Sequence, residues 1–349
     1  MTDTPAAANR HRLLLAFGLF VLAPLVGEFL LGNQPITALP GLVMFAPLYG
    51  GGALLIRETA RRAGRGRPTM ILLAAAYALV EEGPVDQMLW NPHYGGFDIG
   101  AAYSATYVPL LGTSVQMIQD VLALHTVWSI CVPIALLEAF DRDRTRPWLG
   151  GFGLTVTAVV FGAGAALLGL GQAQSEKFVA SAGQFAWAGA AIVALIVAAF
   201  LAGRRPAFPA DSAPPAPAPR TVGLTAFALS SGYWSRDFLP GEGVSAWVLV
   251  GFWCVLAAVA VVVLGRWAHR PGWGDRHRFA LAGGALLTYA WVGFEHGAQM
   301  GLPLTLSVPG SLVFATGAVL LLVAASRALR RREAAPTASL GAARPLPTR

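Results

Sequence analysis

Ten stretches of the sequence are each long and apolar enough to cross a membrane as a helix. A hydrocarbon core about 30 Å thick needs roughly 20 apolar residues in a helix that rises about 1.5 Å per residue. The stretches lie at about 13–32, 39–56, 70–90, 117–139, 148–171, 182–203, 221–239, 245–265, 279–299 and 304–326. The least regular is 221–239, because its apolar run ends at Tyr233 and Trp234. The sequence therefore predicts an all-α, polytopic membrane protein of about ten transmembrane helices.

Composition excludes the other broad classes of protein. Of the 349 residues, 55% are hydrophobic and only 12% are charged, whereas a soluble protein carries about 25% charged residues. Intrinsic disorder is excluded for most of the chain, because disordered segments are poor in hydrophobic residues. We therefore expect a protein that is integral to a membrane, with the lipid bilayer as its surroundings.

The basic residues fix the expected orientation. With ten spans and a cytoplasmic N-terminus, 23 of the 25 Lys and Arg residues fall on the cytoplasmic side, which leaves only Lys177 and Arg236 outside. This asymmetry follows the positive-inside rule, and it predicts that both termini are cytoplasmic. Topology and anionic lipid headgroups also account for the net charge of +7, so we expect no nucleic acid partner.

A Pro- and Ala-rich stretch, PADSAPPAPAPR, divides the apolar segments into two groups. Such a composition is typical of an extended linker. The predicted organisation is a six-span region (1–203) that contains the candidate site, a cytoplasmic linker (204–220), a four-span region (221–326) and a basic, disordered cytoplasmic tail (327–349).

Ionisable side chains inside the spans are the candidates for function, because each costs about 2.5–3.5 kcal/mol to insert at the membrane centre. Most of them lie in the outer halves of the predicted spans: Glu28, Glu81, Glu82, Asp86, Asp120, His125, Glu295 and His296. Their common depth predicts a polar pocket that opens to the outside. The alternative is that each pairs separately with a neighbouring helix. Glu138 lies at the inner end of its span, where a role at headgroup level is expected.

The segment LVEEGPVDQMLWNPHYGGFD (79–98) is the richest in such residues. Pro84 lacks the amide that would bond the carbonyl of Val80, so the helix is expected to kink or unwind just past Glu81 and Glu82. Adjacent helical side chains point about 100° apart. We therefore expect one of the two carboxylates to face the pocket while the other pairs elsewhere.

His125 lies in the next span, on one face with Trp128. Two imidazoles and a carboxylate suit zinc or a similar divalent ion, so His125, Glu295 and His296 are candidate metal ligands. The same residues also suit metal-free chemistry, in which a glutamate activates water. The Tyr-rich segment 91–115 is either a lid over the pocket or part of an interfacial aromatic belt.

The run AAAYALVEEGPVDQML resembles the paired-glutamate helix of the CAAX-protease and bacteriocin-processing family of intramembrane proteases. Asp86 stands where that family has an arginine. The resemblance implies that Glu81 or Glu82 activates water and that His125 corresponds to a later pocket histidine. The rest of the chain, including LHTVWSICVPIALLEA, resembles uncharacterised bacterial multi-pass proteins, which implies a bacterial plasma membrane.

Two classes of function follow from these residues. In an intramembrane hydrolase, Glu81, Glu82 and His125 would be catalytic, and the substrate would be a hydrophobic peptide or a lipid-like molecule. In a transporter or channel, the same side chains would bind a small cation or relay protons. In either class the expected binding residues are Glu28, Asp86, Trp128, Glu295 and His296. A non-catalytic membrane subunit is the third alternative.

Overall fold

A computed structural model describes residues 5–202, 214–238 and 243–334 of the chain, so parts of the predicted linker and tail lie outside the described residues. The helices are α1 (Pro5–Pro24), α2 (Leu42–Arg62), α3 (Arg67–Val80), α4 (Ile99–Ala102), α5 (Val115–Ala123), α6 (Val132–Glu138), α7 (Gly151–Glu176), α8 (Ala182–Ala202), α9 (Pro219–Trp234), α10 (Ala246–Ala268), α11 (Asp275–Gln299) and α12 (Leu304–Ala334). The described strands are β1 (Tyr107–Val108) and β2 (Thr113–Ser114), which pair antiparallel. The predicted all-α membrane fold is confirmed.

Seven helices of the described residues are long and apolar enough to cross a membrane. They are Asn9–Leu30, Ile36–Arg62, Val115–Glu138, Gly151–Glu176, Ala182–Ala202, Ala246–Ala268 and Leu304–Ala334. Helices α3, α9 and α11 coincide with the three other predicted spans, but they are not among the seven. The multi-pass architecture is therefore established, while the number of ten spans stays a prediction.

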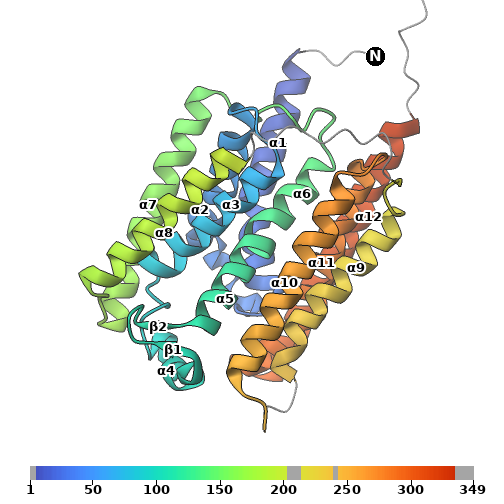
Figure 1. Cartoon of the computed structure of the whole chain (residues 1–349). Coiled ribbons are helices and arrows are strands. Elements are labelled where there is room, and N and C mark those ends of the chain that lie inside the picture. The colour runs from blue at the N-terminus through green and yellow to red at the C-terminus, as the bar shows by residue number, and fades with distance from the viewer. Residues whose placement is uncertain (1–4, 203–213, 239–242, 335–349) are drawn as a thin grey trace, which may run out of the picture.

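The long helices lie side by side as one bundle (Figure 1). Helices α1, α2, α3, α7 and α8 form one side of the bundle and α9 to α12 form the other, with α5 and α6 between them. The start of α1 and the end of α12 lie at the same end of the bundle, opposite α4 and the β1–β2 hairpin. This placement is the one expected when the two termini share a side of the membrane.

The outermost helices present apolar side chains to their surroundings. Only 11% of the most apolar window of α7, α8 and α10 is buried inside the protein, and the side chain of Phe152 on α7 is 85% exposed. A helix with apolar residues all round is stable in hydrocarbon, because its backbone polar groups are satisfied internally. These three helices therefore have the surface expected of lipid-facing spans.

Three helices widen into π-helical segments inside the bundle. The segments are Leu25–Leu30 after α1, Glu81–Val85 after α3 and Leu124–Cys131 between α5 and α6. The second contains Pro84, and its hydrogen bond runs from the amide of Asp86 to the carbonyl of Glu81 (2.7 Å). The helix ends there, with Gln87 at a φ of 59°. The predicted break after the paired glutamates is therefore confirmed, and the helix ends at this break.

The contact between α1 and α2 depends on Gly50. A Cβ atom added there would lie 2.0 Å from the carbonyl oxygen of Phe20, which is a backbone atom and cannot rotate away. We expect Gly50→Ala to lower the free energy of unfolding by about 1–3 kcal/mol, the usual cost of overpacking. Denaturant titration of the purified protein in detergent measures this loss. Gly162→Ala on α7 is the control, because its Cβ would meet open space; equal losses for both variants would contradict the role of close packing.

Candidate functional site

The imidazole of His125 lies between two buried carboxylates. Its Nδ1 is 2.8 Å from Oε2 of Glu81, and its Nε2 is 2.7 Å from Oε1 of Glu82. The three residues are at most 6% exposed. Ser129, one turn after His125, adds a contact between its hydroxyl and Nδ1 (3.2 Å). The structure thus brings together the three residues that were predicted as catalytic, and we call Glu81, Glu82 and His125 the triad.

The triad corrects one expectation from the sequence. Glu81 and Glu82 were expected to point to different partners, since adjacent helical residues diverge. Both instead contact one imidazole ring. Its two nitrogens lie on different sides of the ring, so each nitrogen can contact a different carboxylate. The π-helical segment that contains both glutamates carries them to the same neighbour.

Glu28 adjoins the triad through Tyr49 of α2. The Tyr49 hydroxyl donates a short hydrogen bond to Oε1 of Glu28, and its ring centroid lies 6.0 Å from that of His125. Gly27 makes room for this contact, since a Cβ there would lie 2.9 Å from both the Tyr49 ring and the Ser129 hydroxyl. Glu28, the triad and Ser129 all belong to π-helical segments, and such segments occur frequently at functional sites.

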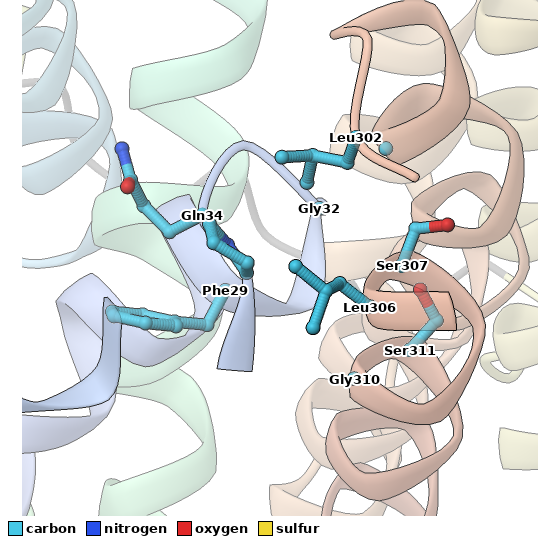
Figure 2. A pocket seen from close by; sticks show the side chains of 10 residues that line it. Phe29, Gly32, Gln34, Leu302, Leu306, Ser307, Gly310 and Ser311 are labelled. Atoms are coloured by element: carbon cyan, nitrogen blue, oxygen red, sulfur yellow. The ribbon is translucent and has the colours of Figure 1, made fainter. Parts of the chain in front are cut away.

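His296 is connected to Glu28 through Asn33. Its Nε2 lies 2.8 Å from Oδ1 of Asn33, whose Nδ2 is 3.4 Å from Oε2 of Glu28. A cavity of about 10 Å³ lies close by, between Gly32 and the start of α12, with Ser307 and Ser311 on its wall (Figure 2). A cavity of this size holds about one water molecule. It has no room for an organic substrate.

Two other predicted binding residues have hydrogen-bond partners outside the triad. Trp128 donates from Nε1 to the carbonyl of Ala285 (2.8 Å) and stacks on Tyr289, with ring centroids 4.6 Å apart. It therefore joins the π-helical segment to α11. Asp86 accepts a hydrogen bond from the hydroxyl of Tyr94 (3.1 Å), which lies in the predicted outer loop.

The predicted metal site is not assembled. Glu295 is exposed, and the ring of His296 contacts Asn33 rather than His125. Within the described part of the chain, no group of three or more His, Cys, Asp or Glu side chains is arranged to hold a metal ion. Both nitrogens of His125 face carboxylate oxygens, which suits two N–H donors rather than a ligand lone pair. The set of His125, Glu295 and His296 was therefore wrong as a group of metal ligands.

Asp120 forms a second buried centre between α5 and α9. Its Oδ1 is paired with Nη2 of Arg236 and accepts from the hydroxyl of Tyr233 (2.6 Å), while Oδ2 accepts from the hydroxyl of Tyr103 (3.0 Å). Arg236, which was expected on the outer side of the membrane, is 9% exposed. This centre joins the two predicted regions near the loop that contains α4.

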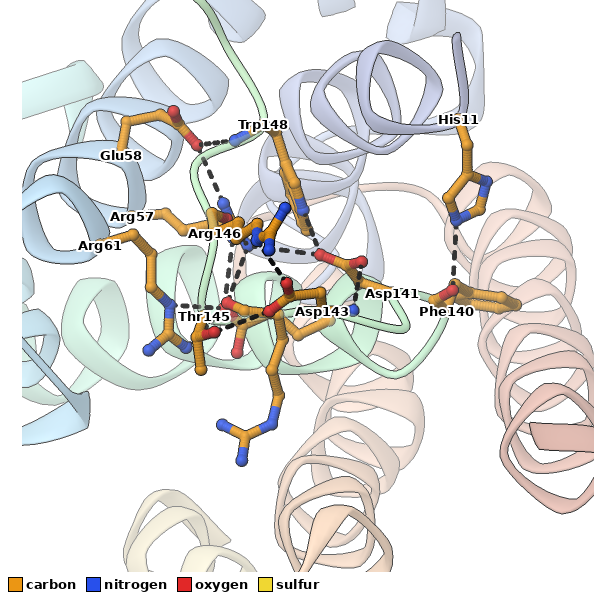
Figure 3. Close-up of polar contacts among 12 residues, drawn as sticks. His11, Arg57, Glu58, Arg61, Phe140, Asp141, Asp143, Thr145, Arg146 and Trp148 are labelled. Carbon is orange, nitrogen blue, oxygen red and sulfur yellow. Dashed lines mark hydrogen bonds and ion pairs between the residues drawn. The ribbon is translucent and has the colours of Figure 1, made fainter. Parts of the chain in front are cut away.

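A buried ion network that was not expected from the sequence lies at the other end of the bundle (Figure 3). Arg57 is fully buried on α2, with Nη1 2.9 Å from Oε1 of Glu58 and Nε 3.2 Å from Oε1 of Glu138. Arg61 pairs with the same oxygen of Glu138 (2.7 Å). Glu138, for which a role at headgroup level was expected, is buried and paired with these two arginines. The run RETARR was interpreted only as an orientation signal, although α2 continues through it to Arg62.

Trp148 and Asp141 complete this network. Trp148 donates from its backbone N to Oε1 of Glu58 (2.8 Å) and from Nε1 to Oδ2 of Asp141 (2.6 Å). The guanidinium of Arg57 lies 3.4 Å from the centroid of the Trp148 ring. The network thus fixes the connection between α6 and α7 against α2.

Asp275, at the start of α11, extends the contacts to the other side of the bundle. Its Oδ1 lies 2.8 Å from both Arg144 Nε and Arg278 Nη1. Burial alone would raise the pKa of Asp275, but Arg144, Arg278 and Arg332 hold it below the usual value. The carboxylate is therefore ionised at neutral pH, and it links α11 to the loop after α6.

Comparison with known proteins identifies the family but adds no chemistry. The model of an uncharacterised membrane protein family matches residues 17–344. No curated protein and no solved structure matches the chain. The resemblance to intramembrane proteases therefore stays a prediction. Because the match spans nearly the whole chain and agrees with a bundle of apolar helices, the protein is an integral, multi-pass membrane protein and belongs to this uncharacterised membrane protein family.

Proposed function

We propose that the protein is a proton-coupled membrane transporter whose coupling proton binds at the triad. The observation that carries this proposal is the imidazole of His125, which has a buried carboxylate oxygen within 2.8 Å of each ring nitrogen. Carboxylates and histidines that face one another inside a membrane are the usual parts of a proton relay. All three groups exchange protons without a change of covalent structure.

Proton counting supports this assignment. Glu28, Glu81 and Glu82 with His125 carry three negative charges when fully deprotonated, so the group is neutral only when it holds three protons. A net charge buried in low dielectric is expensive. Gain or loss of one proton therefore changes the electrostatic energy of the closed arrangement strongly. Such a change is able to drive a switch between conformations if the two conformations differ in proton affinity.

An intramembrane hydrolase is the second candidate. It is favoured by Oε2 of Glu82, a buried carboxylate oxygen that has no hydrogen bond partner among the described residues. A carboxylate of this kind is able to hold and activate a water molecule. The hydrolase requires a cleft through which water and substrate reach Glu82. The proton site requires only that protons reach the triad.

Infrared difference spectra of the purified protein test proton binding without knowledge of the transported solute. We expect a carboxyl band that appears and disappears as the pH is stepped between about 5 and 8, the range over which histidine sites commonly titrate. Glu82→Gln and Glu81→Gln should each change this band, and His125→Asn should shift its midpoint. The control is Glu295→Gln, which changes an exposed glutamate on α11. A band unaffected by all three triad variants would refute the proton site.

Transport is tested in proteoliposomes loaded with a pH-sensitive dye. Pulses of sodium, potassium, magnesium and a panel of amino acids should identify a solute that moves protons across the membrane with the wild type. Glu82→Gln should abolish this movement and Glu295→Gln should leave it intact. Cleavage of a hydrophobic test peptide by the wild type, lost in Glu82→Gln, would instead favour the hydrolase.

A further inference from the structure

A cavity of about 200 Å³ lies among the ends of α9, α11 and α12, at the predicted cytoplasmic end of the bundle. Figure 1 shows these three helices together on one side of the molecule. The polar part of the cavity wall consists of Arg220, Arg276, Arg330 and Ser326. The remainder is apolar and includes Phe279 and Leu329. The cavity therefore combines cationic groups with an apolar surface.

Two of the three guanidinium groups lack a counterion within the described chain. Arg276 forms a two-point ion pair with Glu333, from Nε to Oε1 and from Nη2 to Oε2. Arg220 and Arg330 are exposed, and neither forms an ion pair or hydrogen bond with the residues that the structure describes. The cavity thus has an excess of positive charge and attracts an anion. The N-terminus of α9, at Pro219, adds the positive end of a helix dipole beside Arg220.

The cavity lies at the level where lipid headgroups are expected. Arg220 precedes the apolar part of α9, Arg276 precedes that of α11 and Arg330 follows that of α12. Each helix thus changes from apolar to basic beside the cavity. A basic pocket between helices on the cytoplasmic side is the usual form of a headgroup site for anionic phospholipids.

We propose that this cavity binds the phosphate group of an anionic phospholipid. Arg220 and Arg330 hold the phosphate by charge-assisted hydrogen bonds, and the hydroxyl of Ser326 is available as a further donor. The first carbons of the acyl chains lie against Phe279 and Ala280, which are partly exposed on the cavity wall. The apolar wall favours a lipid over a soluble phosphate compound, which would leave this wall exposed to water. Bound lipid holds α9, α11 and α12 together.

Native mass spectrometry and thermal unfolding of the delipidated, full-length protein in neutral detergent test the proposal. Phosphatidylglycerol should bind and raise the unfolding temperature, and phosphatidylcholine should not. A basic residue near a membrane surface contributes about 1 kcal/mol to the binding of anionic lipid. Arg220→Gln with Arg330→Gln should therefore weaken phosphatidylglycerol binding about 25-fold. The two groups act in the same site, so each single variant should give part of this loss.

Matched controls decide between this cavity and a general attraction to basic residues. Arg327→Gln with Arg331→Gln removes two exposed arginines of the same helix, α12, that do not line the cavity. An equal loss of binding with this pair would overturn the proposal. Sodium phosphate that stabilises the wild type as well as phosphatidylglycerol does would also overturn it, in favour of a soluble phosphate ligand. Binding is measured without transport, so it is independent of the triad.

Discussion

Arg57→Ala should lower the free energy of unfolding by about 3–5 kcal/mol, the usual cost of removing one member of a buried ion network. Arg57 is fully buried, and it faces carboxylate oxygens of Glu58, Glu138 and Asp141 at 2.9, 3.2 and 3.7 Å. Without the guanidinium, the three buried acids keep only Arg61, which pairs with Glu138, and the partly exposed Arg62, which lies 3.8 Å from Glu58. The contact with the face of the Trp148 ring is lost as well.

The loss should appear first in the connection between α6 and α7. Arg57 also donates from Nη2 to the carbonyl oxygens of Arg144 (3.1 Å) and Arg146 (3.2 Å) in this connection. These carbonyls lose a donor when the side chain is shortened. We therefore expect faster hydrogen exchange in residues 141–149 of the variant, together with the lower global stability measured by denaturant titration in detergent.

Arg62→Ala is the matched control, since Arg62 lies on the same helix and its side chain is 34% exposed. Exposed ion pairs contribute about 0–1 kcal/mol, so this variant should stay close to the wild type. Arg57→Lys keeps the charge but not the planar fork, and it should recover only part of the stability. Equal stabilities for Arg57→Ala and Arg62→Ala would show that the network contributes little.

Much of the helix pattern was predictable, because a membrane span has a simple signal of length and hydropathy. The structure ends α9 at Trp234, close to where the apolar run fails, and it breaks the third predicted span at Pro84. Both outcomes follow from local chemistry. The predicted span 39–56 stops at the basic run, whereas the helix α2 continues through this run to Arg62.

The partners of the buried acids were less predictable. The position of a residue along a helix follows from counting residues. This count led to the expectation that Glu28, Glu81, Glu82 and His125 lie close together, as their contacts show. The direction in which a side chain points depends on local helix geometry and on neighbouring helices, which the sequence does not specify. Glu295 was grouped with these residues by its expected depth, but its side chain is exposed. Tyr49 was not expected at the site, because a tyrosine in a span has no charge to mark it.

His125→Leu should be as damaging as the loss of Arg57, for the same physical reason. The imidazole is the partner of both triad glutamates, and leucine offers no donor to either carboxylate. Removal of one partner from a buried ion pair costs about 3–5 kcal/mol. Ser129→Ala, which removes only a hydroxyl contact at 3.2 Å from Nδ1, should cost far less. Denaturant titration of both variants in the same detergent measures the difference.

A double-mutant cycle then separates charge compensation from packing. If His125 stabilises the fold by neutralising Glu82, the substitution Glu82→Gln should be harmful in the wild type but beneficial in His125→Leu. The coupling energy between the two sites should lie at about 0.5–3 kcal/mol, the range for residues in direct contact. Glu295→Gln in the His125→Leu background should show no coupling. If Glu82→Gln instead adds its full cost in both backgrounds, His125 acts through packing alone, and the triad loses the electrostatic linkage on which proton coupling depends.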